Sequence, residues 1–203
     1  MLQLISAAKS LKMPALKTKI SVSPYLYLSG AASLLIFPVR WLFAWIAAVL
    51  VHELFHYGML QLCGVRIHRI TIGLNGAVML TDSMEQITEL KCAIAGPIGS
   101  LSLLLLAKWF PYVAICGLAQ GLYNLLPLFP LDGGRVTVCL LQMFKRRYHT
   151  ENVYFIIKII VFCGLSICGI LALMHNFGPI PLLMTLILFF RTGMENPLAN
   201  RQK

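Results

Sequence analysis

The sequence predicts an all-α polytopic membrane protein with about six transmembrane helices and a small membrane-associated β-hairpin between spans two and three. Of its 203 residues, 59% are hydrophobic and 12% are charged, whereas an ordinary soluble domain has about 45–50% and about 25%. The mean hydropathy is +0.80. Too few polar side chains remain to coat a soluble surface, so we expect most of the surface to face lipid. The same composition excludes a disordered or collagen-like chain.

The apolar runs are separated by charges, prolines and glycines, and these breaks divide them into spans. The run at 41–63 would be about 34 Å long as a helix at about 1.5 Å per residue, which is enough to cross a bilayer. The stretch 110–143 is broken by Pro127, Pro130 and two glycines, so it divides into a span, an irregular segment and a short helix. The predicted spans are 22–39, 41–63, 90–107, 111–127, 152–174 and 179–191.

Residues 64–82 differ from the apolar runs around them. They are rich in β-branched residues and contain Asn75-Gly76, a pair typical of tight hairpin turns. We therefore expect a β-hairpin at the membrane there. The predicted organisation is a basic cytoplasmic arm over 1–20, a membrane domain over 21–191 that includes the hairpin, and a cytoplasmic tail over 192–203.

The charge distribution predicts the orientation. There are 17 Lys and Arg residues against 7 Asp and Glu, for a net charge of +10. Six spans place both termini on one side, and only Arg40 and Lys108 of the basic residues fall on the other side. Because basic loops stay in the cytoplasm, we expect both termini to be cytoplasmic. The positive charge is then topogenic, and no nucleic-acid partner is expected.

A metal-binding motif lies within the second predicted span. Residues 52–56 read His-Glu-Leu-Phe-His. Histidines four residues apart lie on one face of a helix, so His52 and His56 could bind one zinc ion, and Glu53 beside them could take a proton from metal-bound water. Polar residues in an apolar helix usually have a function. The less favoured alternative is that helix–helix hydrogen bonds satisfy all three side chains.

A catalytic zinc site needs a third protein ligand and an open position for water. Asp132 is the other acidic residue at membrane depth, and it lies between Pro130 and Gly133-Gly134. Non-helical backbone there could aim its carboxylate into a cavity. The alternative, which we rank lower, is that Asp132 caps the helix that begins at Gly133.

HELFH in one span and YNLLPLFPLDGGR in a later one, with Ala95-Gly96-Pro97 between them, resemble the site-2 protease family of intramembrane zinc metalloproteases. The order, spacing and hairpin are most similar to the bacterial stage IV sporulation protease subgroup. The resemblance covers about residues 20–190. It implies a multi-pass protein of the bacterial cell membrane that cleaves membrane-tethered substrates such as a sigma-factor precursor, an anti-sigma factor or a remnant signal peptide.

The resemblance implies a role for each matching residue. His52, His56 and Asp132 would hold one zinc ion, and Glu53 would be the general base and then the acid that protonates the leaving amine. Asn124 matches an asparagine that is thought to hold the substrate backbone or to help stabilise the oxyanion. The alternative for Asn124 is a helix–helix hydrogen bond.

The chain departs from the family pattern in three places. Phe55 replaces a residue that is often small, so packing beside the metal is expected to differ. Ser21 and Ser23 stand where the sporulation enzymes tend to carry histidines, which leaves gating there open. The sequence stops at Lys203 without the nucleotide-sensing domain of those enzymes, so control by ATP is not expected.

Two functions of other classes fit part of the pattern. An intramembrane metal transporter would use the same ligands as a transport site, but no acid or histidine lies in 41–51 or 108–131 to supply an outer half-channel. A catalytically silent scaffold would bind membrane helices through the same groove, and the intact motif argues against it. Peptide-bond hydrolysis in the membrane is therefore the favoured function.

Overall fold

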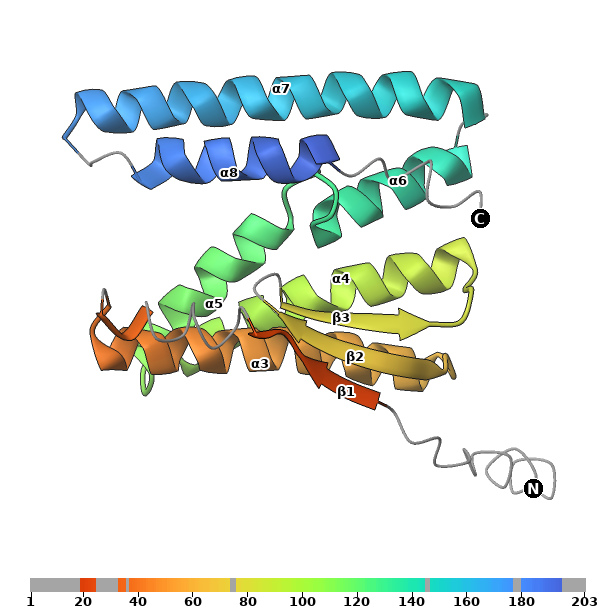
Figure 1. Ribbon diagram of the computed structural model, residues 1–203, viewed down its shortest axis with the longest axis horizontal. Coiled ribbons are helices and arrows are strands. Elements are labelled where there is room, and N and C mark those ends of the chain that lie inside the picture. The colour runs from red at the N-terminus through yellow and green to blue at the C-terminus, as the bar shows by residue number, and fades with distance from the viewer. Residues whose placement is uncertain are drawn as a thin grey trace.

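The computed structural model describes residues 19–24, 33–35, 37–73, 76–144, 147–176 and 180–194. The described part is mostly helical, with one small sheet (Figure 1). Its elements in chain order are β1 (Lys19–Val22), α3 (Val39–Leu62), β2 (Ile67–Gly73), β3 (Gly76–Thr81), α4 (Gln86–Ser102), the 3₁₀ helix η1 (Leu103–Leu106), α5 (Pro111–Asn124), α6 (Asp132–Phe144), α7 (Arg147–Met174) and α8 (Ile180–Met194).

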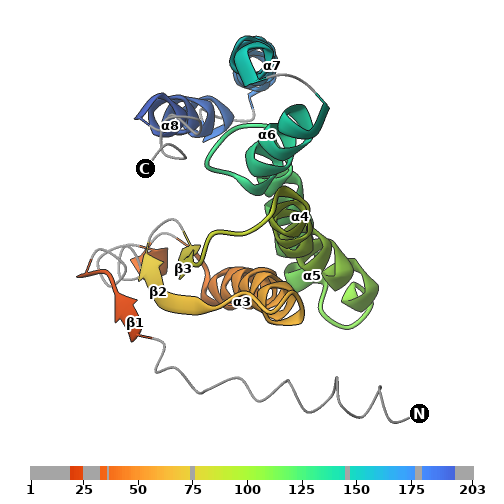
Figure 2. The same ribbon diagram turned by 90° about the vertical axis from the view of Figure 1, so that its right-hand side faces the viewer.

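Helices α3, α4 and α5 pack against one another and form the centre of the molecule. The sheet lies along α3 on the side away from α5, and α7 and α8 form an antiparallel pair beyond α6 (Figures 1 and 2). Small residues bring the central helices together. A Cβ atom at Gly117 of α5 would lie 2.6 Å from the backbone oxygen of Ser100 in α4, so only glycine permits this approach.

Three described helices are long and apolar enough to cross a membrane: Val39–Leu62, Gln86–Leu106 and Glu151–Met174. They coincide with three of the six predicted spans. Helices α5 and α8 have 14 and 15 residues, which is short of the roughly 20 that a straight crossing needs. Half of the first predicted span, 22–39, lies outside the described residues.

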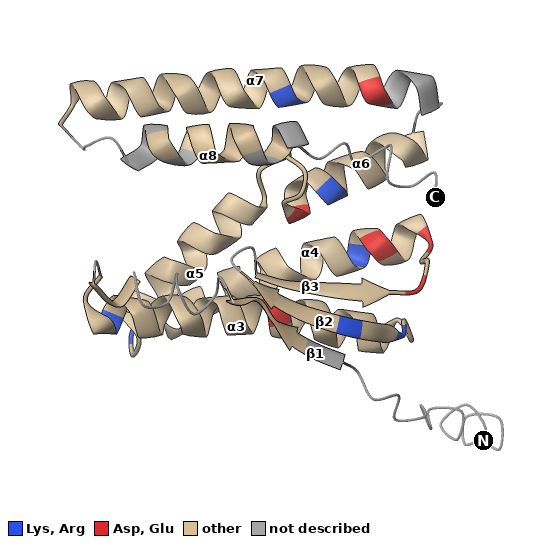
Figure 3. Cartoon of the chain, in the orientation of Figure 1, with Lys and Arg blue, Asp and Glu red and all other residues tan. Residues whose placement is uncertain are grey.

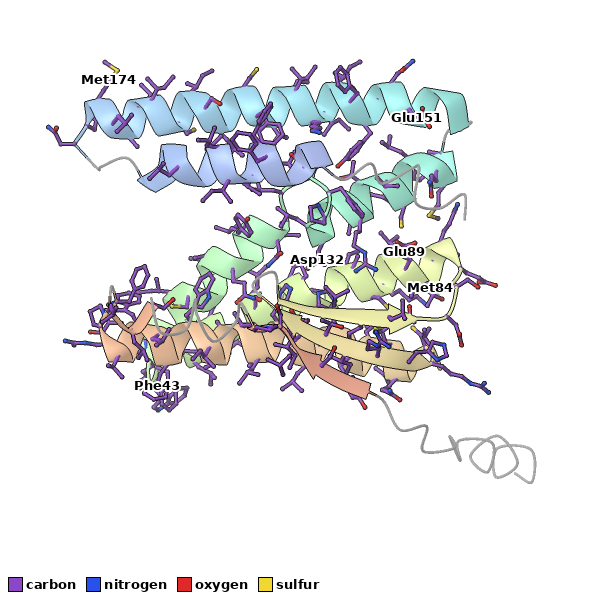
Figure 4. The ribbon with its side chains drawn as sticks, in the orientation of Figure 1. Phe43, Met84, Glu89, Asp132, Glu151 and Met174 are labelled. Atoms are coloured by element: carbon purple, nitrogen blue, oxygen red, sulfur yellow. The ribbon has the colours of Figure 1, made fainter. Side chains whose placement is uncertain are left out.

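Large apolar side chains cover much of the outer surface. Phe43 of α3 and Met174 of α7 are 69% and 74% exposed and point away from the helices around them (Figure 4). A soluble protein would leave few such side chains in water. Most charged residues of the described part lie toward one end of the molecule (Figure 3). Both features fit a protein whose belt faces lipid.

The predicted hairpin is confirmed, but the sheet has three strands. β2 and β3 pair antiparallel, with Thr71 opposite Val78, and β1 pairs in parallel with β2, with Ile20 opposite Ile70. The expectation of a two-stranded hairpin was therefore wrong by one strand, which comes from residues placed in the arm and the first span. β1 covers an edge of β2 whose peptide groups would otherwise lack partners.

Candidate metal centre

The three predicted ligands meet at one point. His52 and His56 lie on α3, and Asp132 is the first residue of α6, next to α4 (Figure 4). Asp132 Oδ2 lies 3.1 Å from Nε2 of each histidine, and the two Nε2 atoms are 3.2 Å apart. One ligand atom from each residue lies within 4.8 Å of the others. The side chains thus converge as the ligands of a single ion would.

The chemistry of this donor set fits zinc. Two imidazoles and one carboxylate are a ligand set of zinc hydrolases, which keep the fourth position for water. His52 and Asp132 are 4% and 8% exposed, so the site lies within the protein between α3, α4 and α6. His52, His56 and Asp132 would hold the ion. Because the Asp132 carboxylate contacts both histidines, Asp132 does more than cap a helix.

Helix α4 orients both imidazoles. His52 Nδ1 lies 2.9 Å from Ser100 Oγ, and His56 Nδ1 donates to the carbonyl oxygen of Cys92 at 2.7 Å. Partners at Nδ1 fix the ring and leave Nε2 free to bind metal. The sequence interpretation missed Ser100 and Cys92. The signal that could have found them is their spacing, because Cys92, Gly96 and Ser100 recur every four residues and so share one face of α4.

The small residues of α4 make room for the motif helix. A Cβ atom at Gly96 would lie 2.1 Å from His56 Nε2, and one at Gly99 would lie 2.5 Å from the Phe55 ring. Gly96 belongs to the Ala-Gly-Pro sequence that was part of the family resemblance, and its physical role is to make room for the His56 imidazole. The Phe55 departure is accommodated in the same way, since its ring packs over a glycine.

The glycines after Asp132 let the preceding loop fold over the start of α6. A Cβ atom at Gly133 would lie 2.2 Å from the backbone oxygen of Leu125, and one at Gly134 would lie 2.3 Å from the Phe129 nitrogen. Any side chain at either position would push the loop away. The loop in turn sets where α6 begins and hence where Asp132 points.

Helices α7 and α8 hold that loop from the other side. Leu128 and Leu131 are buried against Phe162 and Leu188. The Phe129 amide donates to the Tyr154 hydroxyl oxygen at 2.6 Å. The loop that positions the Asp132 carboxylate is therefore held by α7 and α8.

Glu53 lies on α3 beside the ligands, facing the sheet. Its Oε1 accepts a hydrogen bond from the Ala77 amide of β3 at 3.0 Å. Gly76, the first residue of β3, has a φ of +91°, and a Cβ atom there would lie 2.7 Å from Oε1. The hairpin predicted from Asn75-Gly76 thus reaches the predicted base, a contact that the sequence did not reveal.

Asn124 is the last residue of α5, and the structure does not bring it into contact with the ligands. Its Nδ2 donates to the carbonyl oxygen of Gln120 at 3.1 Å, within its own helix. Ser21 lies on β1, where its hydroxyl is 3.0 Å from that of Thr71. The Ser23 amide donates to Ile72 O at 2.9 Å. The roles of Asn124, Ser21 and Ser23 therefore stay predictions.

Comparison with known proteins points to one family. Residues 79–168 match the model of peptidase family M50. The chain is 28% identical over 165 residues to a zinc metalloprotease of Methanocaldococcus jannaschii, covering 73% of this chain and 47% of that protein. It is 30% identical over 129 residues to the Mycobacterium tuberculosis protein Rip3, covering 53% of this chain and 31% of that protein. The chain thus spans half or less of the length of these curated relatives.

A solved structure shares the fold. The site-2 protease from Methanocaldococcus jannaschii aligns with a TM-score of 0.62 at 23% identity, covering 90% of this chain and 93% of that chain. The M50 match includes Asp132 and begins after His52 and His56. The motif that contains the two histidines is therefore an observation separate from this match. These relatives give no support to the sporulation subgroup, which stays a prediction from the sequence.

Proposed function

We propose that this protein is an intramembrane zinc metalloprotease of the M50, site-2 protease type, which hydrolyses peptide bonds in or near transmembrane segments. The observation that carries the proposal is the convergence of His52, His56 and Asp132 on one point beside Glu53. These groups come from a helix long and apolar enough to span a membrane and from a second segment 76 residues further on.

A zinc ion bound there would polarise the scissile carbonyl and lower the pKa of its bound water. Glu53 would be the general base in this chemistry and would then donate the proton to the leaving amine. Ser100 and Cys92 hold the imidazoles with Nε2 toward the ion. Asn124 is proposed to hold the substrate backbone or the developing oxyanion, which requires its side chain to leave its bond to Gln120.

The substrate has to be unwound, because a helix hides its carbonyl groups in its own hydrogen bonds. The hairpin supplies an edge to which an extended segment can add as a strand. β3 is an edge strand of the order β1-β2-β3, and its first residues contact Glu53. The edge therefore leads to the proposed base.

We further propose six spans in a bacterial cell membrane, with both termini cytoplasmic and with the arm, the 21–191 domain and the tail divided as the sequence predicts. The partners are the lipid bilayer and a membrane-tethered protein, such as a sigma-factor precursor, an anti-sigma factor or a remnant signal peptide. Neither transport nor a silent scaffold gains support, because a candidate base beside a three-ligand site serves hydrolysis.

The test is co-expression with candidate single-span proteins, comparing wild type with Glu53→Gln. Wild type should cleave the substrate. Glu53→Gln should bind the substrate without cleaving it, so the two should copurify. Alanine variants of His52, His56 and Asp132 should lose both zinc and cleavage. Retained cleavage in Glu53→Gln would show that another group is the base, and transport of zinc without cleavage would favour the transporter.

A further inference from the structure

One edge of the sheet is joined to the proposed base by a single amide. β3 is one of the two edge strands of the sheet, and among the described residues no other strand pairs with its outer edge. Ala77 lies opposite Ile72, yet its N–H points away from β2 and donates to Glu53 Oε1 at 3.0 Å. Because amides alternate in direction along a strand, the Met79 amide faces the same outer edge.

The contact depends on the residue before Ala77. Gly76 has a φ of +91°, a conformation that suits glycine. A Cβ atom at Gly76 would stand 2.7 Å from Glu53 Oε1, so any other residue would push the carboxylate off the strand. The backbone of the sheet edge and the Glu53 side chain are thus in contact, and the glycine at position 76 leaves room for it.

The same amide cannot serve two acceptors well. A strand that adds to β3 places one of its carbonyl oxygens on each outward amide of the edge. At Ala77 the acceptor of this hydrogen bond is already Glu53 Oε1. The base must therefore leave before a substrate carbonyl can bind there, and the candidate metal ligands His52 and His56 lie beside it on α3.

We propose that Glu53 and the substrate backbone compete for the Ala77 amide, so that an extended substrate releases the base when it docks. The inference rests on the proposed function and adds a step that regulates the base. It requires the segment to be unwound before the base is free.

Two proline variants test the exchange. Ala77→Pro deletes the amide that holds Glu53, and Met79→Pro deletes the next outward amide, which Glu53 does not contact. The probes are unfolded fluorescein-labelled casein, which is long enough to lie along β3, and a fluorogenic dipeptide amide, which is too short to replace Glu53 at Ala77. Zinc content and the thermal unfolding midpoint establish that each variant is folded.

The competition predicts a different effect for each variant. Ala77→Pro should raise kcat/KM for the dipeptide by roughly three- to tenfold, because the base no longer has a hydrogen bond to break. Met79→Pro should lower kcat/KM for casein by roughly three- to tenfold, because a bond to the substrate strand is lost. An unchanged or lowered dipeptide value in Ala77→Pro overturns the proposal, since the amide would then orient the base or do nothing.

Amide hydrogen exchange gives a second readout that needs no cleavage. In Glu53→Ala the Ala77 amide should exchange at least tenfold faster than in wild type, while the Val78 amide, which faces β2, should be unchanged. Equal Ala77 exchange in both proteins overturns the proposal. If wild type cleaves neither probe with zinc bound, the proposed function fails, and the exchange rates still decide whether Glu53 holds this amide.

Discussion

Gly96→Ala should displace a metal ligand without changing any group that takes part in the chemistry. The new Cβ atom would lie 2.1 Å from His56 Nε2 and 2.6 Å from His56 Cε1. Carbon and nitrogen atoms in contact stand about 3.5 Å apart, so the ring or α4 must move by more than about 1 Å. Zinc–nitrogen bonds tolerate only about 0.2 Å. We therefore expect zinc affinity to fall by about 10- to 100-fold and cleavage to fall by about 100-fold or more.

The assay is zinc content after titration with a chelator, measured together with cleavage of a copurified substrate. Gly58→Ala is the matched control, because Gly58 lies on α3 two residues after His56 and a Cβ atom there meets nothing within 4 Å. The control should bind zinc and cleave as wild type does. If Gly96→Ala also binds zinc and cleaves normally, α4 does not pack on His56 as described, and the geometry of the site is wrong.

Three further predictions concern the groups around the ligands. Ser100→Ala should weaken zinc binding by about 10- to 100-fold through loss of the partner of His52 Nδ1, and unchanged zinc affinity would show that the hydroxyl has no role. Gly133→Ala should destabilise the protein by about 1–3 kcal/mol in unfolding experiments, because its Cβ would overlap Leu125; a small effect would mean that the loop can move. Tyr154→Phe should lower stability by about 1–3 kcal/mol, because the Phe129 amide would lose its acceptor, and a neutral result would argue that another group replaces the hydroxyl.

The ligands could be predicted because local rules place them. Two histidines four residues apart share a helix face whatever the rest of the fold does. The prolines before Asp132 predict a break between helices, but the expected non-helical backbone at Asp132 itself was wrong, because Asp132 is the first residue of α6. The hairpin was predictable for the same reason, since Asn75-Gly76 favours a tight turn. In each case the information lies within a few residues of the chain.

Features that depend on distant segments were not predictable in this way. Strand β1 is only four residues long, and its partner Ile70 lies 50 residues after Ile20, so no local pattern marks it as a strand. The contact between Ala77 and Glu53 likewise joins separate elements. Gly96 could be recognised as a small residue in a helix, but the imidazole that needs its space belongs to another helix.

The most direct test of the account is to measure zinc content and substrate cleavage together for Glu53→Gln and Asp132→Ala. We predict that Glu53→Gln binds one zinc ion per chain, as wild type does, and does not cleave, because only the base has changed. Asp132→Ala should lose most of the zinc as well as cleavage. Cleavage by Glu53→Gln, or full zinc binding by Asp132→Ala, would contradict the assignment of the base or of the third ligand.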